Sequence, residues 1–392
     1  MKVLLIEPYY TGSHQAWADG YQAHSRHQIE LLTLPGRFWK WRMQGGALTL
    51  ARQALELDSQ PDLILASDML NLPVFLSLYN GLAAKDQLGA DRAHLSNLPV
   101  AFYFHENQLT YPLQPGEKRD LHYGFINFVS ALRADAAFFN SAYHLQAFFD
   151  ELPRLLKHFP DYAELWAVDA LRAKSRVLPL GLDLSHLAGH RLGGAAADQR
   201  ANARRPLILW NHRWEYDKDP ETFFRAIYTL AGEAENSGPD FGLIILGESF
   251  RNEPAEFLVA RDRLAKHLVH FGYAQDPAAY ARLLGQADIV VSTALHEFFG
   301  AAVVEACYCG CFPILPHRLA YPELIPEEHH ARCLYEDFDG LLNHLRQAVH
   351  RVEETRAFSL QSHMARFDWT QMAPLYDEVL EQVSSQGAAV TL

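Results

Sequence analysis

The feature that most constrains the fold of this chain is a regular alternation of short apolar runs with longer, helix-like segments. Residues 3–6, 29–33, 63–66, 100–104, 136–140 and 177–179 form one series of predicted strands, and residues 207–211, 242–246, 269–271, 289–292 and 312–315 form a second. Continuous apolar strands with helices between them are typical of parallel sheets that are covered on both faces. We therefore expect an α/β protein with two doubly wound, Rossmann-like domains that face a central cleft, where such folds bind their ligands.

A linker is predicted between the two series. Residues 186–205 are rich in Gly, Ala and Arg and have no hydrophobic period, which is typical of a connecting segment. The first domain then spans residues 1–185 and the second spans residues 206–365. Residues 366–392 are expected to form a C-terminal helix that packs back on the first domain, with apolar Met372, Leu375, Tyr376 and Val379.

Composition excludes several classes of protein. The 392 residues carry a formal net charge of −13, which argues against unselective coating of nucleic acid but allows one local basic face. The apolar start before Glu7 is too short for a signal peptide, and no run approaches the roughly 18 apolar residues of a membrane span. Four cysteines make no disulfide framework in a chain of this length. We expect a cytoplasmic protein without a membrane partner.

Two glutamates lie in the turn and helix that follow the strand at 289–292. Glu305 comes eight residues after Glu297, which is about 12 Å if the whole segment is helical. Between them, the backbone N–H groups of Gly300 and Ala301 open the helix and could hold an anion. Two hydroxyl acceptors beside an anion site suit a sugar–diphosphate–ribose ligand. The alternative is a solvated loop residue and a surface charge.

Two cations follow the first strand of the second series. Arg213 and Lys218 lie between the strand at 207–211 and a helix that opens near Pro220. Arg offers a fork of donors and Lys a point charge, so together they can neutralise a diphosphate without a metal. The alternative is a pair of surface cations.

Two patterns suggest a metal site, but their contexts argue against one. Asp217 and Asp219 form a D-x-D pattern, yet Asp219 followed by Pro220 is more typical of a helix start. The cysteines at 307, 309 and 311 alternate along a helix end, where they do not gather easily into a tetrahedron. No metal is expected.

Polar residues also follow two strands of the first series. Gly12 permits a tight turn after the strand at 3–6, and Ser13 can cap the next helix, whose N-terminus would be a second anion site. His105, Glu106 and Asn107 follow the strand at 100–104 directly, so we expect them at the ligand-binding edge. His105 could bond a hydroxyl of a donor or of an acceptor, although a lone histidine among 20 is more often structural.

One short segment combines aromatic rings with cations, and we call it the aromatic–basic segment. It consists of Arg37, Phe38, Trp39, Lys40, Trp41 and Arg42. Rings stack on unpaired bases and cations follow the backbone, so the segment is expected to bind an RNA loop. Gly45 and Gly46 are expected to let this loop move or to let a backbone approach closely. The alternative is that the tryptophans pack under a lid and the cations are solvated.

The motifs of the second half resemble those of the retaining GT-B glycosyltransferases of family 4. The similarity covers Arg213 with Lys218, residues 270–300, and the pair Glu297 and Glu305. It implies that Arg213 and Lys218 hold the donor diphosphate, that Glu297 contacts the transferred sugar and that Glu305 binds the donor ribose. The implied donor site comprises Gly12, Arg213, Lys218, Gly272, Tyr273, Glu297, Phe299, Gly300, Ala301 and Glu305.

The first half, through residues 1–20 and 102–112, resembles the tRNA-queuosine mannosyltransferase family. This similarity runs almost from end to end, except that a single glycine, Gly12, replaces the usual Gly-Gly turn. It implies retaining transfer of mannose from GDP-mannose to queuosine in the anticodon loop of tRNA-Asp, without a metal. The implied catalytic residues are His105, Arg213, Lys218 and Glu297, and the implied tRNA contacts are the aromatic–basic segment with Glu106 and Asn107. The alternatives are a related transferase with a lipid, glycan or small-molecule acceptor, a sugar-nucleotide epimerase, or a non-catalytic nucleotide- or RNA-binding protein.

Overall fold

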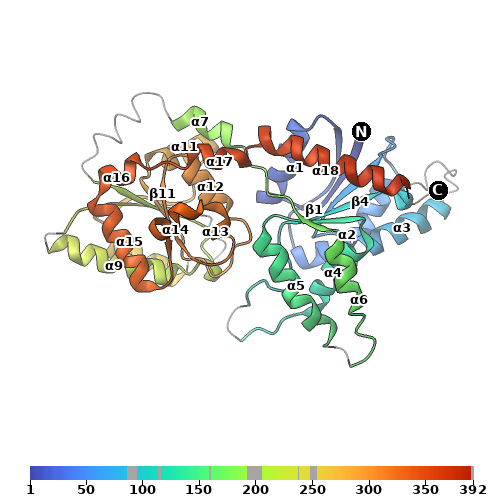
Figure 1. The fold of residues 1–392 in the computed structure, drawn as a ribbon, viewed down its shortest axis with the longest axis horizontal. Coiled ribbons are helices and arrows are strands. Elements are labelled where there is room, and N and C mark those ends of the chain that lie inside the picture. The colour runs from blue at the N-terminus through green and yellow to red at the C-terminus, as the bar shows by residue number, and fades with distance from the viewer. Residues whose placement is uncertain are drawn as a thin grey trace. The chain divides into compact units, whose positions relative to one another are not determined.

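The computed structural model describes residues 1–85, 95–113, 116–158, 160–191, 205–236, 238–247 and 254–389. The chain divides into two compact units, which Figure 1 colours along the sequence. Unit 1 contains residues 1–182 and 369–392, and unit 2 contains residues 183–368. The chain therefore passes from one unit to the other twice.

Unit 1 is built on a sheet of six parallel strands in the order β2-β1-β3-β4-β5-β6. The strands are β1 (Lys2–Tyr10), β2 (Gln28–Pro35), β3 (Leu63–Ser67), β4 (Val100–Phe104), β5 (Ala136–Phe139) and β6 (Ser175–Val177). The first five predicted strands are confirmed. The sixth, at 177–179, is wrong because β6 is an edge strand whose Ser175 and Arg176 are polar, so no apolar run marks it.

Helices cover both faces of this sheet. They are α1 (Gly12–His24), α2 (Trp39–Ala54), α3 (Leu72–Lys85), α4 (Leu121–Arg133), α5 (Ala142–Leu156), α6 (Trp166–Ala173) and α18 (Trp369–Ala389). A large buried cluster joins strand residues such as Ile6 and Phe102 to helices α2 to α6. Tyr103, the next residue along β4, points to the opposite face and stacks on Trp17 of α1, as the period of two in a strand requires.

The C-terminal helix α18 packs beside α1, on the second face of the sheet (Figure 1). Tyr376 is fully buried, and its hydroxyl donates to the Pro179 carbonyl at 2.9 Å and accepts from Trp17 Nε1 at 3.3 Å. Met372, one turn earlier, is buried on the same side. Leu375, which was expected to share this apolar side, is instead 41% exposed, because adjacent positions of a helix face different directions.

Unit 2 contains a second sheet of six parallel strands in the order β12-β11-β10-β7-β8-β9. The strands are β7 (Leu207–Asn211), β8 (Gly242–Leu246), β9 (Leu268–Gly272), β10 (Ile289–Val291), β11 (Phe312–Pro316) and β12 (Leu334–Tyr335). The second predicted series is confirmed strand by strand. Strand β12 was not predicted, because two residues are too short to form a recognisable apolar run.

The helices of unit 2 are more numerous and mostly shorter. They are α7 (Leu184–Arg191), α9 (Pro220–Glu235), α10 (Ala255–Arg263), α11 (Pro277–Gln286), α12 (Ala301–Tyr308), α13 (Tyr321–Leu324), α14 (His330–Cys333), α15 (Phe338–His350), α16 (Val352–Ala357) and α17 (Gln361–Met364). Every residue of β8 and β11 is buried, as expected for a parallel sheet covered on both faces. Both units are therefore doubly wound α/β structures, as predicted.

The predicted linker is partly helical. Helix α7 covers its first residues, up to Arg191, and residues 192–204 lie outside the described residues. The carboxylate of Asp183 accepts from the His186 N–H at 3.2 Å, and that of Asp368 accepts from the Leu184 N–H at 3.1 Å. The first N–H groups of a helix need such partners, so α7 ties together the two ends of unit 2.

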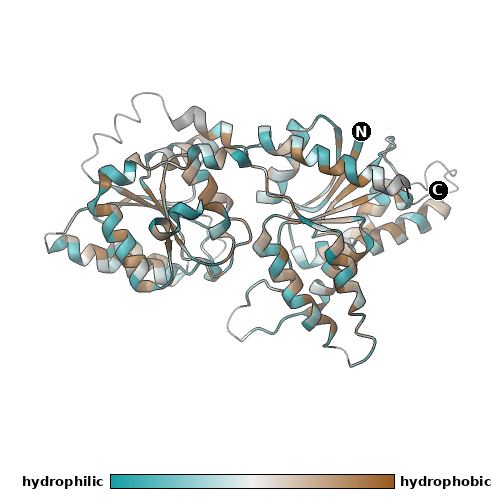
Figure 2. Ribbon diagram, viewed as in Figure 1, coloured by the Kyte–Doolittle hydropathy of each residue, from teal (hydrophilic) through white to brown (hydrophobic). Residues whose placement is uncertain are grey.

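The hydropathy of the chain follows this layering. Figure 2 shows apolar strands at the centre of each unit and helices whose polar and apolar residues alternate around the axis, which is typical of helices that cover a core. Within the described ranges, none of the helices has both the length and the apolar composition that crossing a membrane requires.

In both sheets the strand order reverses beside the first strand. From β1 the chain moves to β2 on one side and then to β3 on the other, and from β7 it moves to β8 on one side and later to β10 on the other. Loops on the two sides of such a reversal diverge and leave the carboxyl strand ends open to a ligand. The topology therefore favours a site after β1 and β3 in unit 1, and after β7 and β10 in unit 2.

The burial of Tyr376 gives a test of how α18 packs. Tyr376→Ala should lower the free energy of unfolding by about 3–5 kcal/mol, the usual cost of truncating a buried aromatic side chain. Leu375→Ala is the matched control and should change it by less than about 0.5 kcal/mol, because that side chain is largely exposed. Urea unfolding followed by tryptophan fluorescence measures both values, and equal losses would contradict the packing of α18 on α1.

Candidate active site

In unit 2 a compact group of charges forms where β7 and β10 lie side by side. Lys218 ends the short turn after β7, and its Nζ donates to the His296 carbonyl at 2.8 Å. The same ammonium lies 3.4 Å from Glu297 Oε2 and 3.2 Å from Asp217 Oδ2. Because His296 and Glu297 belong to the loop after β10, one ammonium group joins the loops of the two strands.

These charges are matched inside a largely buried environment. The side chain of Lys218 is 8% exposed and that of Glu297 is 22% exposed. Burial alone would lower the pKa of Lys218, but the charges of Glu297 and Asp217 raise it above its usual value. Burial alone would raise the pKa of Glu297, but Lys218 lowers it to about 2. Both groups are therefore ionised at neutral pH.

Arg213 adds a second cation to this group. Its guanidinium is half exposed and lies 3.4 Å from Glu215, and its charge acts on Lys218. His212 and His296 are buried nearby, and burial, followed by repulsion from Lys218, lowers the pKa of each to about 4. Because both imidazoles are neutral, the positive charge comes from Arg213 and Lys218.

Helix α12 begins directly after the loop that carries Glu297. Gly300 precedes the helix with φ of 96°, a left-handed conformation that favours glycine. Ala301 is the first helical residue, and the opening N–H groups of a helix have no partner within it, so they can bind an anion. The ring of Phe299 is buried against Phe367, with 5.1 Å between ring centroids, and its expected donor contact stays a prediction.

Glu305, on α12, belongs to a second polar network. Its carboxylate accepts a hydrogen bond from the Tyr280 hydroxyl, which itself accepts one from Asn211 Nδ2 at 2.8 Å. Burial raises the pKa of Glu305 to about 7, against the lowering effect of the bond from Tyr280. Asn211 is the last residue of β7. Glu297 and Glu305 are thus both linked to the carboxyl end of β7, one through Lys218 and the other through Asn211.

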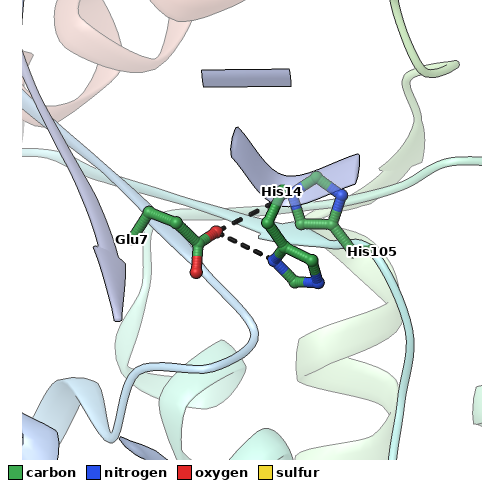
Figure 3. A group of neighbouring side chains, drawn as sticks. All are labelled: Glu7, His14 and His105. Carbon is green, nitrogen blue, oxygen red and sulfur yellow. Dashed lines mark hydrogen bonds and ion pairs between the residues drawn. The ribbon is translucent and has the colours of Figure 1, made fainter. Parts of the chain in front are cut away.

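Unit 1 places a different group at its own strand reversal (Figure 3). Glu7 lies in β1, His14 in α1, and His105 directly after β4. Glu7 Oε2 lies 3.0 Å from His14 Nδ1 and 4.0 Å from His105 Nε2. The register of β1 with β2 shifts between Glu7 and Tyr10, and irregularities of this kind redirect side chains near active sites.

Neighbouring groups fix the position of His105. Asp68, directly after β3, accepts from the His105 backbone N–H at 2.9 Å, and Asn140 Nδ2 donates to the His105 carbonyl at 2.9 Å. The rings of Trp17 and His105 meet edge to face with 4.7 Å between centroids. Segments that follow β1, β3 and β5 therefore hold this one residue.

The two histidines have different charges. Burial alone would lower the pKa of His14, but the charge and hydrogen bond of Glu7 raise it to about 9. Burial, followed by the charge of His14, lowers the pKa of His105 well below its usual value. At neutral pH His14 is therefore a cation paired with Glu7, and His105 is neutral.

Three possible ligand atoms of this group lie within 4.8 Å of one another. The shortest of their contacts, 3.0 Å between Glu7 Oε2 and His14 Nδ1, has the length of a hydrogen bond. We interpret Glu7 and His14 as an ion pair.

Comparison with known proteins decides the family. The description "tRNA-queuosine alpha-mannosyltransferase N-terminal" matches residues 2–182, and "Glycosyl transferases group 1" matches residues 195–359. A tRNA-queuosine alpha-mannosyltransferase from Drosophila melanogaster is 31% identical over 388 residues, with 97% of this chain and 96% of the relative covered. The chain belongs to the tRNA-queuosine alpha-mannosyltransferase family. A GDP-mannose:cellobiosyl-diphosphopolyprenol alpha-mannosyltransferase from Xanthomonas campestris is 25% identical over 301 residues, or 73% of each chain.

Solved structures establish the fold of this family member as GT-B. A sucrose-phosphate synthase from Thermosynechococcus elongatus has a TM-score of 0.67 at 15% identity and covers 98% of this chain and 100% of its own. Anabaena Alr3699/HepE in complex with UDP and glucose has a TM-score of 0.64 at 16% identity, with 97% and 99% covered. At such identities the likeness concerns the fold alone. With the family, it makes this chain a glycosyltransferase, as predicted.

One prediction about unit 1 of this transferase is wrong, and another, the tRNA contact of Asn107, stays a prediction. Ser13 does not cap α1, because the helix begins at Gly12 and Ser13 lies inside it. Asn107, expected to contact tRNA, is fully buried, and its Oδ1 accepts from the N–H groups of Leu109 and Thr110 at 3.0 Å each. Its polarity therefore serves the turn that follows His105.

The other expected donor residues, and Glu106 from the expected tRNA contacts, lie near strand or helix ends. Gly12 begins α1 with φ of 51°, and Gly272 ends β9 with φ of 121°. Tyr273, the next residue, has an exposed ring. Glu106 is partly buried and accepts from Gln108 Nε2 at 2.8 Å. Whether these side chains contact substrate stays a prediction.

The aromatic–basic segment begins helix α2. Phe38 precedes the helix in a left-handed conformation, with φ of 53°. Its ring is 80% exposed and that of Trp41 is 61% exposed, whereas Trp39 packs on Tyr123 with 5.0 Å between ring centroids. Arg42 Nε donates to a backbone carbonyl at 2.9 Å, so this cation helps to hold the turn.

The expectation of a mobile loop at Gly45 and Gly46 is wrong. Both glycines lie inside α2, whose buried residues include Met43, Ala47 and Leu50. This spacing is helical. A Cβ at Gly45 would come 2.7 Å from the Trp41 ring, so this glycine gives that ring room to lie along the helix.

Neither of the two patterns that suggested a metal gathers metal ligands. Asp219 caps α9, accepting from the Thr222 N–H at 3.1 Å, and Asp217 pairs with Lys218. The cysteines at 307, 309 and 311 are buried thiols, and Cys311 Sγ donates to the Ala287 carbonyl at 3.4 Å. Over the described residues, only Glu7, His14 and His105 bring three possible ligand atoms together.

Sequence reasoning missed Glu7, His14 and Tyr280. Glu7 had a visible signal, since it is a charged residue at the end of an apolar strand and precedes the Gly12 turn. His14 follows the same turn by two positions. Tyr280 had no signal, because its role depends on α11 and α12 lying side by side.

The pairing in unit 2 predicts an effect of Lys218 on stability. Lys218→Met should lower the free energy of unfolding by about 3–5 kcal/mol at pH 7, because it leaves two carboxylates buried without their cation. In the wild type the pKa of Glu297 is about 2, below its usual value of 4.5. The ion pair therefore stabilises the wild type fully above pH 4.5, and this stabilisation is lost as the pH falls toward 2. The difference in free energy of unfolding between wild type and variant should therefore shrink in acid.

Urea unfolding at pH 7 and at lower pH measures this effect. Lys266→Met is the matched control, because that lysine is exposed and lies 3.9 Å from Glu235, and surface ion pairs contribute little. A Lys218 variant as stable as the control at pH 7 would disprove the pairing.

Proposed function

We propose that this protein transfers mannose from GDP-mannose to queuosine in the anticodon loop of tRNA-Asp, with retention of configuration. The observation that carries the proposal is the Lys218–Glu297 pair at the strand reversal of unit 2, in a chain of this family. The Drosophila relative is named for the acceptor, and the Xanthomonas relative is named for GDP-mannose. Both names support the assignment.

The donor would bind among the charges of unit 2. Lys218, Arg213 and the opening N–H groups of α12 would stabilise the diphosphate, both in the bound donor and in the departing GDP. Glu297 would orient the mannosyl group, and Glu305 would accept hydrogen bonds from the ribose hydroxyls. Because Lys218 is already held by two carboxylates without a ligand, little reorganisation is needed when the donor arrives.

The transfer itself needs no metal in this proposal. The acceptor hydroxyl oxygen forms a bond to the anomeric carbon on the face that GDP leaves, and the bond between that carbon and the phosphate oxygen breaks. A phosphate oxygen of the departing GDP takes the hydroxyl proton. The residues contribute charge stabilisation and orientation.

Mass spectrometry of digested nucleosides tests the reaction directly. Incubation with GDP-mannose and queuosine-containing tRNA-Asp should add one hexose to queuosine, and EDTA should not reduce the yield. The same tRNA with guanine at that position should gain none. Transfer from UDP-glucose but not from GDP-mannose would overturn the donor, and no transfer from any nucleotide sugar would overturn the acceptor.

A carboxylate variant tests the role of Glu297 in the same assay. Glu297→Gln should abolish transfer but retain GDP binding, measured by calorimetry, because Glu297 would contact the sugar rather than the nucleotide. Glu221→Gln, an exposed glutamate in the first turn of α9, is the control and should behave as the wild type.

The exposed rings of the aromatic–basic segment would contact the anticodon loop. Phe38 and Trp41 present their rings to solvent, with Arg37 and Lys40 exposed beside them. Unpaired bases stack on such rings, and exposed cations contact phosphates. A chain with a net charge of −13 needs a local surface of this kind to approach RNA.

Replacing both rings tests this surface. Phe38→Ala with Trp41→Ala should weaken tRNA binding at least about tenfold, since each stacked base contributes about 1–3 kcal/mol. Arg37→Ala with Lys40→Ala should reduce the slope of log Kd against log salt concentration. Tyr162→Ala, which removes another exposed ring of unit 1, is the control, and an equal loss there would show that the segment has no special role.

A further inference from the structure

One oxygen of Glu7 faces two imidazoles that differ in charge. Glu7 Oε2 lies 3.0 Å from His14 Nδ1 and 4.0 Å from His105 Nε2 (Figure 3). His14 Nδ1 donates a hydrogen bond to Glu7. At 4.0 Å His105 Nε2 makes no hydrogen bond to Glu7, but the negative charge of the carboxylate favours the tautomer with a proton on this nitrogen. The position of Glu7 therefore determines which nitrogen of each ring is left for other partners.

The remaining nitrogens, His14 Nε2 and His105 Nδ1, are turned away from Glu7 (Figure 3). His14 is a cation, so its Nε2 also carries a proton and is a donor. His105 is neutral with its proton on Nε2, so its Nδ1 is an acceptor. The two side chains are 10% and 6% exposed, so the rings are buried but not sealed.

The two rings are held close together. Their centroids are 4.2 Å apart and their planes are tilted by 41°. Trp17 and Tyr103 contact the His105 ring at centroid distances of 4.7 and 5.0 Å, and Asp68 and Asn140 hold its backbone. One fixed donor thus lies beside one fixed acceptor at the strand reversal of unit 1.

We propose that Glu7, His14 and His105 form a subsite for two adjacent hydroxyl groups of a substrate. His14 Nε2–H donates to one hydroxyl oxygen, and His105 Nδ1 accepts the proton of the other. Glu7 keeps both rings in the required protonation state and contacts no substrate atom, so it is a positioning residue. The inference rests on the proposed function, which supplies two such ligands: the cyclopentene diol of queuosine and the mannosyl group of the donor.

Two variants and two kinetic constants distinguish these sources. His14→Gln and Glu7→Gln are compared with His24→Gln, which changes an exposed histidine on the same helix. The KM for queuosine-containing tRNA is measured by mannose transfer, and the KM for GDP-mannose by its slow hydrolysis without tRNA. If the diol belongs to queuosine, the KM for tRNA rises about tenfold to a hundredfold, as expected for one lost charge-assisted hydrogen bond. The KM for GDP-mannose then stays within about twofold of the wild-type value. If the diol belongs to mannose, the second KM rises instead.

A binding measurement gives a readout that does not depend on turnover. If the queuosine diol occupies this subsite, the wild type binds tRNA that contains queuosine more tightly than the same tRNA with guanine. His14→Gln then removes this preference, and its affinity for the guanine-containing tRNA stays the same as that of the wild type. If mannose occupies the subsite, the preference survives and GDP-mannose binding falls toward that of GDP.

Several outcomes overturn the subsite. The first is that both KM values stay at wild-type levels in both variants, and the second is that the two KM values rise equally. The third is that both variants fail to fold, as measured by circular dichroism, which would mean that the ion pair serves stability. A wild type that transfers no mannose would instead refute the proposed function. The two failures are therefore distinguishable.

Discussion

One ammonium group, that of Lys218, connects the two loops of unit 2 that would contact a donor. It reaches Asp217 in its own loop, and the backbone carbonyl of His296 and the carboxylate of Glu297 in the loop after β10. A charge in this environment is tolerated only with close partners, so the pairing fixes the positions of both loops at once. Helix α12 follows from Glu297 through the left-handed Gly300, and its anion-binding end is positioned by the same contact.

The reversal of strand order decides where this pairing can occur. In each sheet the first strand has its successors on both sides, so two loops diverge at its carboxyl end and leave backbone and side-chain groups accessible. In unit 2 the cation Lys218 lies at this strand end, paired with carboxylates. In unit 1 one carboxylate, Glu7, lies at the corresponding strand end beside two histidines. In the proposed function, the same topology would therefore present a surface for an anionic group in one unit and for hydroxyl groups in the other.

Most of the fold could be predicted because parallel strands covered on both faces are continuous apolar runs. Apolar runs did not predict the strands that lack such a run: β6 is a polar edge strand, and β12 has two residues. Helices were harder to place. The glycines at 45 and 46 suggested a loop, but Met43, Ala47 and Leu50 bury one side of α2 and keep it helical, because tertiary packing overrides the weak preference of glycine against helix.

The sequence by itself determined the two parallel sheets, the family, and the residue types proposed to meet a sugar nucleotide, because these depend on local periodicity and short spacings. Only the tertiary structure decided which side chains meet. It buried Asn107 under its own turn. It left Phe38 and Trp41 exposed, whereas Trp39 is partly buried against Tyr123. It also brought Tyr280 to Glu305 and His105 to Glu7. The contacts of Tyr280 with Glu305 and of His105 with Glu7 join residues that are 25 or more positions apart in the chain. Such contacts are set by how strands and helices pack rather than by any pattern along the sequence.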